Sequence, residues 1–319
     1  MSKEDDEKEA LRRQMDNLLG DLSPLIPYFD MPSVTNIYVY GSGTIEIDEF
    51  GVDSYYTDFT LSISDRMRII NSLSSISDTP IDNFKWPSLE SIIPKYNIRT
   101  TALMPPVVKF PEITFRRPAE KVYTLEDYVD SERLSKEFYD KIILHLEKRS
   151  NIVVSGSTGS GKTTFTNSLL HKMGELTPNE RFYIVEDVPE LQCTARKTTQ
   201  LYIRKDQAIY AIQTALRWTP KRIIFGEIRS GDVAVELLEA WNTGHPGNVT
   251  TIHADNAAST ITRIEGLLRQ KIAGKLPDLS WTIGLIVHLG SRPGFGPFID
   301  EVLTMQEVTM QKVLKGEVA

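Results

Sequence analysis

The residues with the clearest chemistry form a glycine-rich run that ends in lysine and threonine. Residues 156–163 satisfy the phosphate-loop pattern G-x-x-x-x-G-K-[ST] without a mismatch. An apolar run at 151–154 precedes them and a helical pattern follows, so backbone N–H groups and a helix N-terminus would face phosphates. A chance glycine-rich turn explains this combination poorly. We predict that the nucleotide-binding residues are Gly156, Ser157, Thr158, Gly159, Ser160, Gly161, Lys162, Thr163 and Thr164.

Two side chains of this run have individual roles. Lys162 would neutralise the β- and γ-phosphates of ATP, and Thr163 would hold Mg²⁺ through its hydroxyl. The predicted cofactors are therefore ATP and Mg²⁺.

Carboxylates follow two apolar runs further along the chain. Glu227 ends Ile-Ile-Phe-Gly-Glu, and Glu186 and Asp187 follow Ile184-Val185. The carboxyl ends of parallel strands line the ligand crevice in open α/β sheets. We expect the strand of Glu227 to pair beside the phosphate loop, so that Glu227 orients or deprotonates water. Glu186 and Asp187 are candidates for the same site, whereas Glu190 is expected to be structural or on the surface.

Two histidines, His245 and His253, bracket the apolar run 249–252, which we expect to be the last short strand. A single histidine is most often a packing or hydrogen-bonding residue. The alternative is a sensor that bonds the γ-phosphate or a water molecule.

The elements that must position these residues alternate along the second part of the chain. After a helix at about 134–148, apolar runs at 152–155, 182–185, 223–225 and 249–252 alternate with helical patterns such as 207–218 and 233–241. This alternation predicts an α/β domain with a mostly parallel sheet over residues 134–319.

The first part of the chain predicts a smaller α+β domain over residues 1–118. Apolar spacing indicates a leading amphipathic helix at 4–22 and another at 65–77. Short β-prone runs between 34 and 61, with a hairpin signal at Gly41-Ser42-Gly43, and a last strand at 112–116 complete it. Residues 119–133 would form a linker and hinge.

Composition excludes several classes of protein. With 40% hydrophobic and 25% charged residues the chain has the make-up of a folded globular protein. Cys193 is the single cysteine, so an internal disulfide and a multi-cysteine zinc site are excluded. The N-terminus lacks the features of a signal peptide and no apolar run approaches ~20 residues, which favours a cytoplasmic protein with at most peripheral membrane contact. The net charge of −7 disfavours broad phosphate-backbone binding.

Four motifs together resemble those of the secretion-superfamily traffic ATPases in order and spacing. They are the phosphate loop, the acidic box Glu186-Asp187, the segment Gly226-Glu-Ile-Arg229 and the histidine box at 243–253. The run at 185–193 and His245-Pro-Gly are most similar to the TrbB-like ATPases of conjugative type IV systems. The resemblance implies a RecA-like fold for the ATPase domain, a homo-hexameric ring, and partners among the cytoplasmic and inner-membrane components of a secretion machine. It implies a location at the inner face of the cytoplasmic membrane. From the acidic charge balance, no sequence-specific nucleic-acid binding is expected.

The resemblance also implies roles for individual residues. Glu186 and Glu227 would activate water, with Lys162 in the catalytic set, and His253 would couple hydrolysis to motion. Arg99 and Arg116 are candidates for first-domain arginines that reach the γ-phosphate, with Arg117 as an alternative to Arg116. Arg229 is a further arginine candidate of the site. Ser230 and Val188 depart from the pattern of many relatives, which have aspartate and proline there.

Three rival functions stay open at this stage. A type IV pilus or type II secretion motor of the assembly kind usually carries a four-cysteine metal site, which one cysteine cannot supply. A nucleic-acid translocase is disfavoured by the acidic balance. A ring that uses ATP only as a clamp would bind nucleotide without releasing phosphate.

Overall fold

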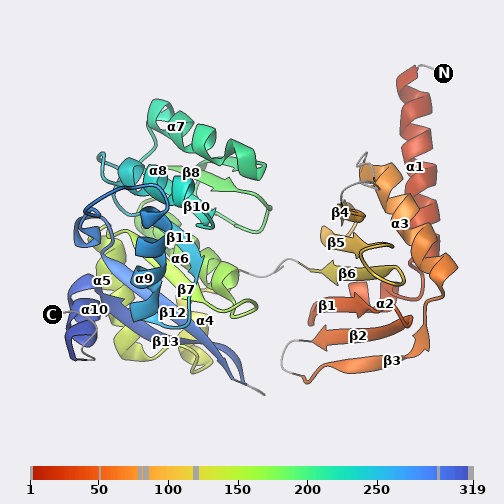
Figure 1. The fold of residues 1–319 in the computed structure, drawn as a ribbon, viewed down its shortest axis with the longest axis horizontal. Coiled ribbons are helices and arrows are strands. Elements are labelled where there is room, and N and C mark those ends of the chain that lie inside the picture. The colour runs from red at the N-terminus through yellow and green to blue at the C-terminus, as the bar shows by residue number, and fades with distance from the viewer. Residues whose placement is uncertain are drawn as a thin grey trace. The chain divides into compact units, whose positions relative to one another are not determined.

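The computed structural model describes residues 3–49, 52–77, 81, 86–117, 122–292 and 295–314. It divides into two compact units, Met1–Glu120 and Lys121–Ala319, and each contains one β-sheet (Figure 1). The mixed α/β class and the mostly parallel sheet are therefore confirmed. Within the described ranges, no helix has the length and apolar character to cross a bilayer.

The smaller unit is built on a six-stranded antiparallel sheet with the order β3-β2-β1-β6-β5-β4. Alternate residues of its strands, such as Ile37, Ile45 and Phe115, enter one core together with Leu18 and Ile70 of the helices, as the two-residue period of a strand requires. The elements are α1 Lys3–Asp21, α2 Ile26–Phe29, β1 Val34–Val39, β2 Thr44–Glu49, β3 Tyr55–Thr60, α3 Ile63–Ser77, β4 Ser88–Ile93, β5 Ile98–Leu103 and β6 Glu112–Arg116.

The larger unit has a seven-stranded sheet with the order β13-β12-β7-β11-β10-β8-β9. All its neighbouring strands are parallel except the β12–β13 hairpin at one edge. The strands are β7 Ile152–Gly156, β8 Arg181–Glu186, β9 Lys197–Tyr202, β10 Arg222–Glu227, β11 Val249–His253, β12 Leu285–Arg292 and β13 Gly296–Thr304. The helices are α4 Leu125–Asp130, α5 Lys136–Glu147, α6 Lys162–Leu176, α7 Ala208–Trp218, α8 Gly231–Trp241, α9 Ala257–Arg269 and α10 Met305–Leu314, with short 3-10 turns η1 Lys205–Gln207 and η2 Leu279–Trp281.

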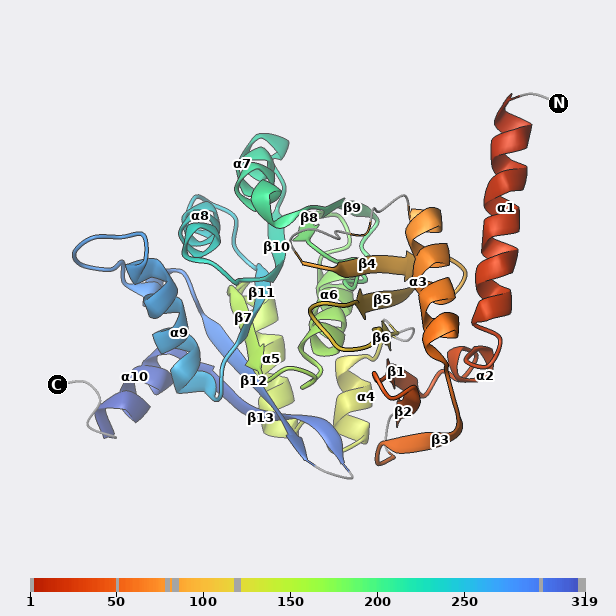
Figure 2. The same ribbon diagram turned by 45° about the vertical axis from the view of Figure 1, so that its right-hand side comes forward.

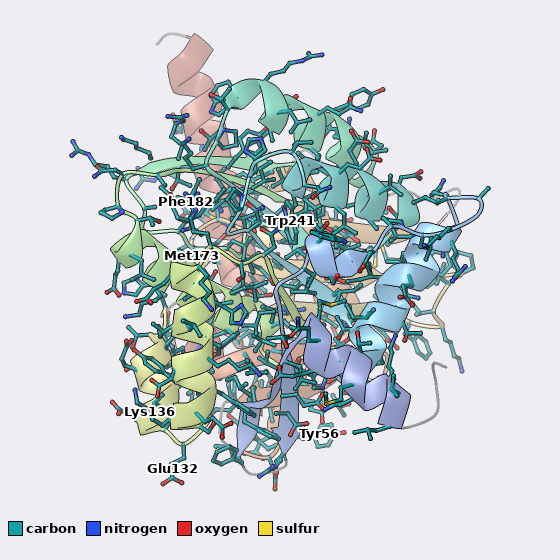
Figure 3. All side chains as sticks on the ribbon, turned by 90° about the vertical axis from the view of Figure 1, so that its left-hand side faces the viewer. Tyr56, Glu132, Lys136, Met173, Phe182 and Trp241 are labelled. Atoms are coloured by element: carbon teal, nitrogen blue, oxygen red, sulfur yellow. The ribbon has the colours of Figure 1, made fainter. Side chains whose placement is uncertain are left out.

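Helices cover both faces of this sheet. Residues of α4, α5 and α6 share one buried cluster with one set of strand residues, and residues of α7 to α10 share another with the alternate set (Figures 1 and 2). Phe182 and Met173 belong to the first cluster and Trp241 to the second (Figure 3). The strands are apolar on both faces because both faces are covered.

Two expectations about strand order are corrected. The strand of Glu227, β10, does not pair with β7, because β11 lies between them. Nor is β11 the last strand, since β12 and β13 follow it and β12 pairs with the other side of β7.

The expected linker at 119–133 is corrected in its C-terminal part, which is helical. Helix α4 begins at a capping box in which Thr124 and Asp127 exchange side-chain to backbone hydrogen bonds of 2.9 and 3.0 Å. Its Tyr128 packs edge-on against Phe165 of α6, with ring centroids 5.3 Å apart. This segment is therefore anchored to the larger unit.

Candidate active site

The phosphate loop joins β7 to α6 in the larger unit. Gly156 ends β7 and lies in register with His253 of β11 and Leu289 of β12, and α6 begins at Lys162. Glu227 and Glu186 end β10 and β8. The parallel register thus brings the carboxyl ends of four strands, and the side chains predicted from them, to one edge of the sheet.

A continuous chain of charged and polar contacts runs along this edge. The Lys162 Nζ donates to the backbone oxygens of Gly156 and Ser157 at 3.0 and 2.7 Å and lies 3.2 Å from His253 Nδ1. On the other side of the ring, His253 Nε2 lies 3.2 Å from Glu227 Oε1. Glu227 Oε2 accepts a hydrogen bond of 2.9 Å from Arg229.

Arg229 extends this series of contacts to Asp187 through a second ion pair. Lys162, His253, Glu227, Arg229 and Asp187 therefore form one connected series.

The protonation state of His253 follows from its neighbours. Burial, and then the positive charge of Lys162, hold the pKa of His253 below its ordinary value, so the neutral ring is favoured. A lysine ammonium can only donate, which leaves Nδ1 as the acceptor and places the ring proton on Nε2, directed at Glu227. The histidine thus connects a cation to a carboxylate without being charged.

The acidic box has a different environment. Glu186 is 3% exposed; its Oε2 accepts from the backbone N–H groups of Glu190 and Leu191 at 2.9 Å each, and its Oε1 accepts from Gln200. Burial is the largest influence on the pKa of Glu186 and raises it, against the effect of these hydrogen bonds. Glu186 is thus tied to the loop that follows its own strand.

Glu190, which the sequence placed on the surface or in a structural role, contacts the phosphate loop. Its Oε2 accepts a hydrogen bond of 3.0 Å from the Thr163 hydroxyl. Asn167, one turn further along α6, donates to the backbone oxygen of Glu190 at 3.1 Å and accepts from Gln192 N at 2.9 Å. Glu190 and Asn167 were both missed, although Asn167 lies four residues after Thr163, on the same helix face.

The other predicted residues lie elsewhere. His245 precedes β11 at the end opposite the phosphate loop, and its Nδ1 lies 3.0 Å from the Pro220 oxygen. Arg99 and Arg116 belong to the smaller unit, where they are directly opposite each other on β5 and β6. The backbone of Arg117 donates to Thr35 at 2.9 Å.

The loop has the features that a triphosphate and Mg²⁺ require. The Ser160 hydroxyl is buried and has no hydrogen-bond partner among the described residues, and the ammonium group of Lys162 lies on backbone oxygens that phosphate oxygens could replace. No group of three or more His, Cys, Asp or Glu side chains in the described ranges could hold a metal alone. A Mg²⁺ ion here would depend on Thr163, water and phosphate oxygens, which are the ligands that it prefers.

A cavity of about 320 Å³ adjoins this edge. It is lined by Glu227, Ile228, Arg229, Ile252, His253 and Arg263. Glu227 and His253 therefore border space that can hold water.

Comparison with known proteins identifies the family. The family described as Type II/IV secretion system protein matches residues 22–289. The chain belongs to this family. It is 33% identical over 305 residues to the conjugal transfer protein TrbB of Rhizobium radiobacter, covering 93% of this chain and 90% of that protein. It is 28% identical to the type IV secretion system protein VirB11 of Bartonella henselae, covering 75% and 78% of the two chains.

Among solved structures, the ATPase DotB of Legionella pneumophila matches with a TM-score of 0.66 at 21% identity, covering 92% of this chain and 83% of that one. The pilus retraction motor PilT with bound ADP matches with a TM-score of 0.65 at 20% identity, covering 91% and 87%. These likenesses support the fold. The resemblance to TrbB-like secretion ATPases stated from the sequence is confirmed by the family and its relatives.

Proposed function

We propose that this protein hydrolyses Mg-ATP through a RecA-like phosphate-loop domain and acts as the ring-shaped motor of a type IV secretion or conjugative transfer apparatus. The observation that carries the ATPase proposal is the connected series from Lys162 through His253 to Glu227 beside the phosphate loop. The names of the TrbB and VirB11 relatives support the cellular role.

The residues divide the chemistry between them. The bound nucleotide would supply the electrophilic phosphate, and Mg²⁺ would neutralise part of its negative charge. Lys162 exchanges its two backbone oxygens for phosphate oxygens, and Thr163 presents its hydroxyl to the metal. Glu227 orients the attacking water from the cavity that it lines.

Assembly into a homo-hexamer at the membrane periphery, with other secretion components as partners, belongs to the same proposal. The proposal extends to Arg99 and Arg116 of the smaller unit, which lie directly opposite each other on β5 and β6 and which the family resemblance assigns to contact with the γ-phosphate.

The test is phosphate release by the purified chain. Glu227→Gln should lower turnover by about 10²–10⁴-fold while binding of a non-hydrolysable ATP analogue is retained. Glu239→Gln, an exposed glutamate on α8, is the matched control and should keep wild-type turnover. Native mass spectrometry with the same analogue should show the hexamer. Wild-type protein that binds nucleotide without releasing phosphate would support the clamp instead of the motor.

A further inference from the structure

The two edges of the larger sheet differ in how their backbone groups are used. At the β13 edge, Ile299 N donates to the Arg133 oxygen at 2.8 Å, and the Val302 oxygen accepts from the Lys141 ammonium group at 2.8 Å. The opposite edge is β9, which pairs with β8 over residues 197–202 (Figure 2). Among the described residues, no backbone hydrogen bond other than those to β8 reaches this strand.

The backbone groups on the outer side of β9 can be assigned from the register. Ile203 N donates to the Glu186 oxygen at 2.9 Å, so the backbone of residue 203 faces β8. In a parallel pair, successive residues of a strand direct their N–H and C=O groups to opposite sides. The backbone groups of Thr198, Gln200 and Tyr202 therefore face away from the sheet. A row of this kind is a template on which a further strand can pair.

The usual devices that block a sheet edge are missing from this strand. Edges are commonly protected by proline, by a bulge or by charged side chains that point outward. The six residues of β9 include no proline, and their register with β8 has no bulge. Their one charged residue, Lys197, is the first of the strand, and its ammonium group donates to the Asn179 oxygen at 3.2 Å. The strand is thus regular enough for another chain to join it.

The surroundings of this edge are basic, in contrast to the chain as a whole. Residues 196–221, which include β9 and α7, contain six Lys or Arg and one Asp, whereas the whole chain has a net charge of −7. Arg196, Arg217 and Lys221 are exposed and make no ion pair among the described residues. Charge complementarity therefore favours an acidic segment at this edge.

Aromatic side chains flank the same strand. Trp218 of α7 donates from Nε1 to the Thr199 hydroxyl at 3.1 Å, which holds the indole beside β9, and it is 55% exposed. Tyr202, at the end of the strand, is 60% exposed. Both rings offer apolar area to the side chains of an added strand. Nucleic acids and anionic membranes also attract basic and aromatic side chains, but neither carries the alternating N–H and C=O groups that complete a sheet.

We propose that the outer edge of β9 is the docking site for an extended, acidic segment of a partner protein, which adds to the larger sheet as a further strand. In this mode of recognition, main-chain hydrogen bonds supply the affinity and the flanking side chains supply the specificity. The inference goes beyond the proposed function, because the chemistry at the phosphate loop does not use the outer edge of β9.

The probe is a blocked peptide of about ten residues in which glutamate alternates with valine, long enough to span the six residues of β9. Its binding to the full-length chain is measured by fluorescence anisotropy without nucleotide. Hydrogen–deuterium exchange should slow over residues 197–203 when the peptide is bound, because the outward amide groups would donate to it. The same peptide with every amide N-methylated keeps its charge but has no N–H donors, and it should bind at least about tenfold more weakly.

A proline variant tests the role of the backbone. The N–H group of residue 198 faces outward, so Thr198→Pro breaks no bond to β8 but removes one donor and obstructs the edge. It should weaken binding of the glutamate–valine peptide about tenfold. Thr198→Val is the matched control, because it also loses the hydroxyl that donates to the Ala195 oxygen at 2.7 Å but keeps the N–H group. Its affinity should stay at the wild-type value.

A charge reversal tests the role of the basic surroundings. Arg217→Glu combined with Lys221→Glu should weaken binding of the same peptide about 3- to 10-fold at low salt, and by less as the salt concentration rises. Arg269→Glu combined with Lys275→Glu makes the same change of charge at exposed positions on and after α9 and should leave the affinity nearly unchanged.

Equal affinity for the N-methylated peptide, or unchanged exchange over residues 197–203, overturns the proposal. So does the absence of saturable binding up to about 1 mM peptide. Both measurements use the wild-type chain, so they decide the matter even if Thr198→Pro does not fold. A single-stranded oligothymidylate or phosphatidylglycerol vesicles that slow the same exchange and displace the peptide would assign the edge to a nucleic acid or a membrane instead. A folded Thr198→Pro chain that no longer assembles would assign it to a second copy, which also overturns the proposal.

Discussion

Two glycines of the phosphate loop differ in the room that they leave for a side chain. At Gly156, with φ +155°, an added Cβ would lie 2.4 Å from Ser160 Oγ and 2.6 Å from the backbone oxygen of Leu289. At Gly159, with φ +75°, no atom lies within 4 Å of an added Cβ. Alanine at the first position therefore clashes with the neighbouring strand, whereas alanine at the second meets only backbone strain.

The expected losses follow from these contacts. Gly159→Ala should lower the free energy of unfolding by about 1–2 kcal/mol, because a residue with a Cβ is strained in the left-handed backbone conformation. Gly156→Ala adds about 1–3 kcal/mol of overpacking, for a total of about 2–5 kcal/mol, because the Leu289 oxygen belongs to β12 and cannot rotate away. At about 2–4 °C for each kcal/mol in a unit of this size, the melting temperature should fall by roughly 2–8 °C in Gly159→Ala and by roughly 4–20 °C in Gly156→Ala.

The assay is thermal unfolding without nucleotide, followed by near-ultraviolet circular dichroism and checked by urea titration. Wild type and the two single variants are compared at one pH. Equal destabilisation by both alanines, or a larger loss at Gly159, would refute the reasoning, because it would mean that the approach of β12 to the loop does not exist in solution.

Three further outcomes are expected. Lys162→Met should bind ADP too weakly to raise its melting temperature, whereas saturation at 100 times the dissociation constant adds about 2.7 kcal/mol to the wild type; thermal shift with Mg-ADP checks this. Asn248→Ala should cost about 2–4 kcal/mol in urea unfolding, because the buried N–H of Ile223 loses its 2.6 Å acceptor. Burial holds the pKa of His288 below its ordinary value, so the stability from its neutral ring is present above about pH 6.5 and is lost as the pH falls further. The free energy of unfolding should therefore decline less between pH 7 and 5.5 in His288→Gln than in the wild type.

The elements nearest the phosphate loop could be predicted because their signals are local. The apolar run of β7, the glycine pattern and the helical spacing of α6 all lie within one stretch of sequence. Helix α4 could also have been predicted, since Thr124 and Asp127 have the spacing of a capping box. The apolar start of β12, Leu285-Ile-Val-His-Leu289, is a strand signal of the same kind as that of β7 and was overlooked.

Other features were not available from local patterns. Strand β9 reads Lys-Thr-Thr-Gln-Leu-Tyr and is mostly half-buried at the sheet edge, so it lacks an apolar run. The contact of Glu190 with Thr163 joins residues 27 positions apart and depends on the path of the loop after β8. The order of the strands in the sheet is likewise a property of the whole fold. Which of the predicted arginines serves the nucleotide stays a prediction.

The strand order has a chemical consequence that the motifs alone do not reveal. Neighbouring strands are about 4.8 Å apart, and β11 separates β7 from β10, so Glu227 lies about two strand spacings from the end of β7, where the Lys162 ammonium is held. A side chain from the middle strand is needed to connect them. His253, in register with Gly156, is that side chain, and its two ring nitrogens reach Lys162 and Glu227 at 3.2 Å each. Its role as a link therefore follows from the topology of the sheet, which places the end of β11 between the ends of β7 and β10.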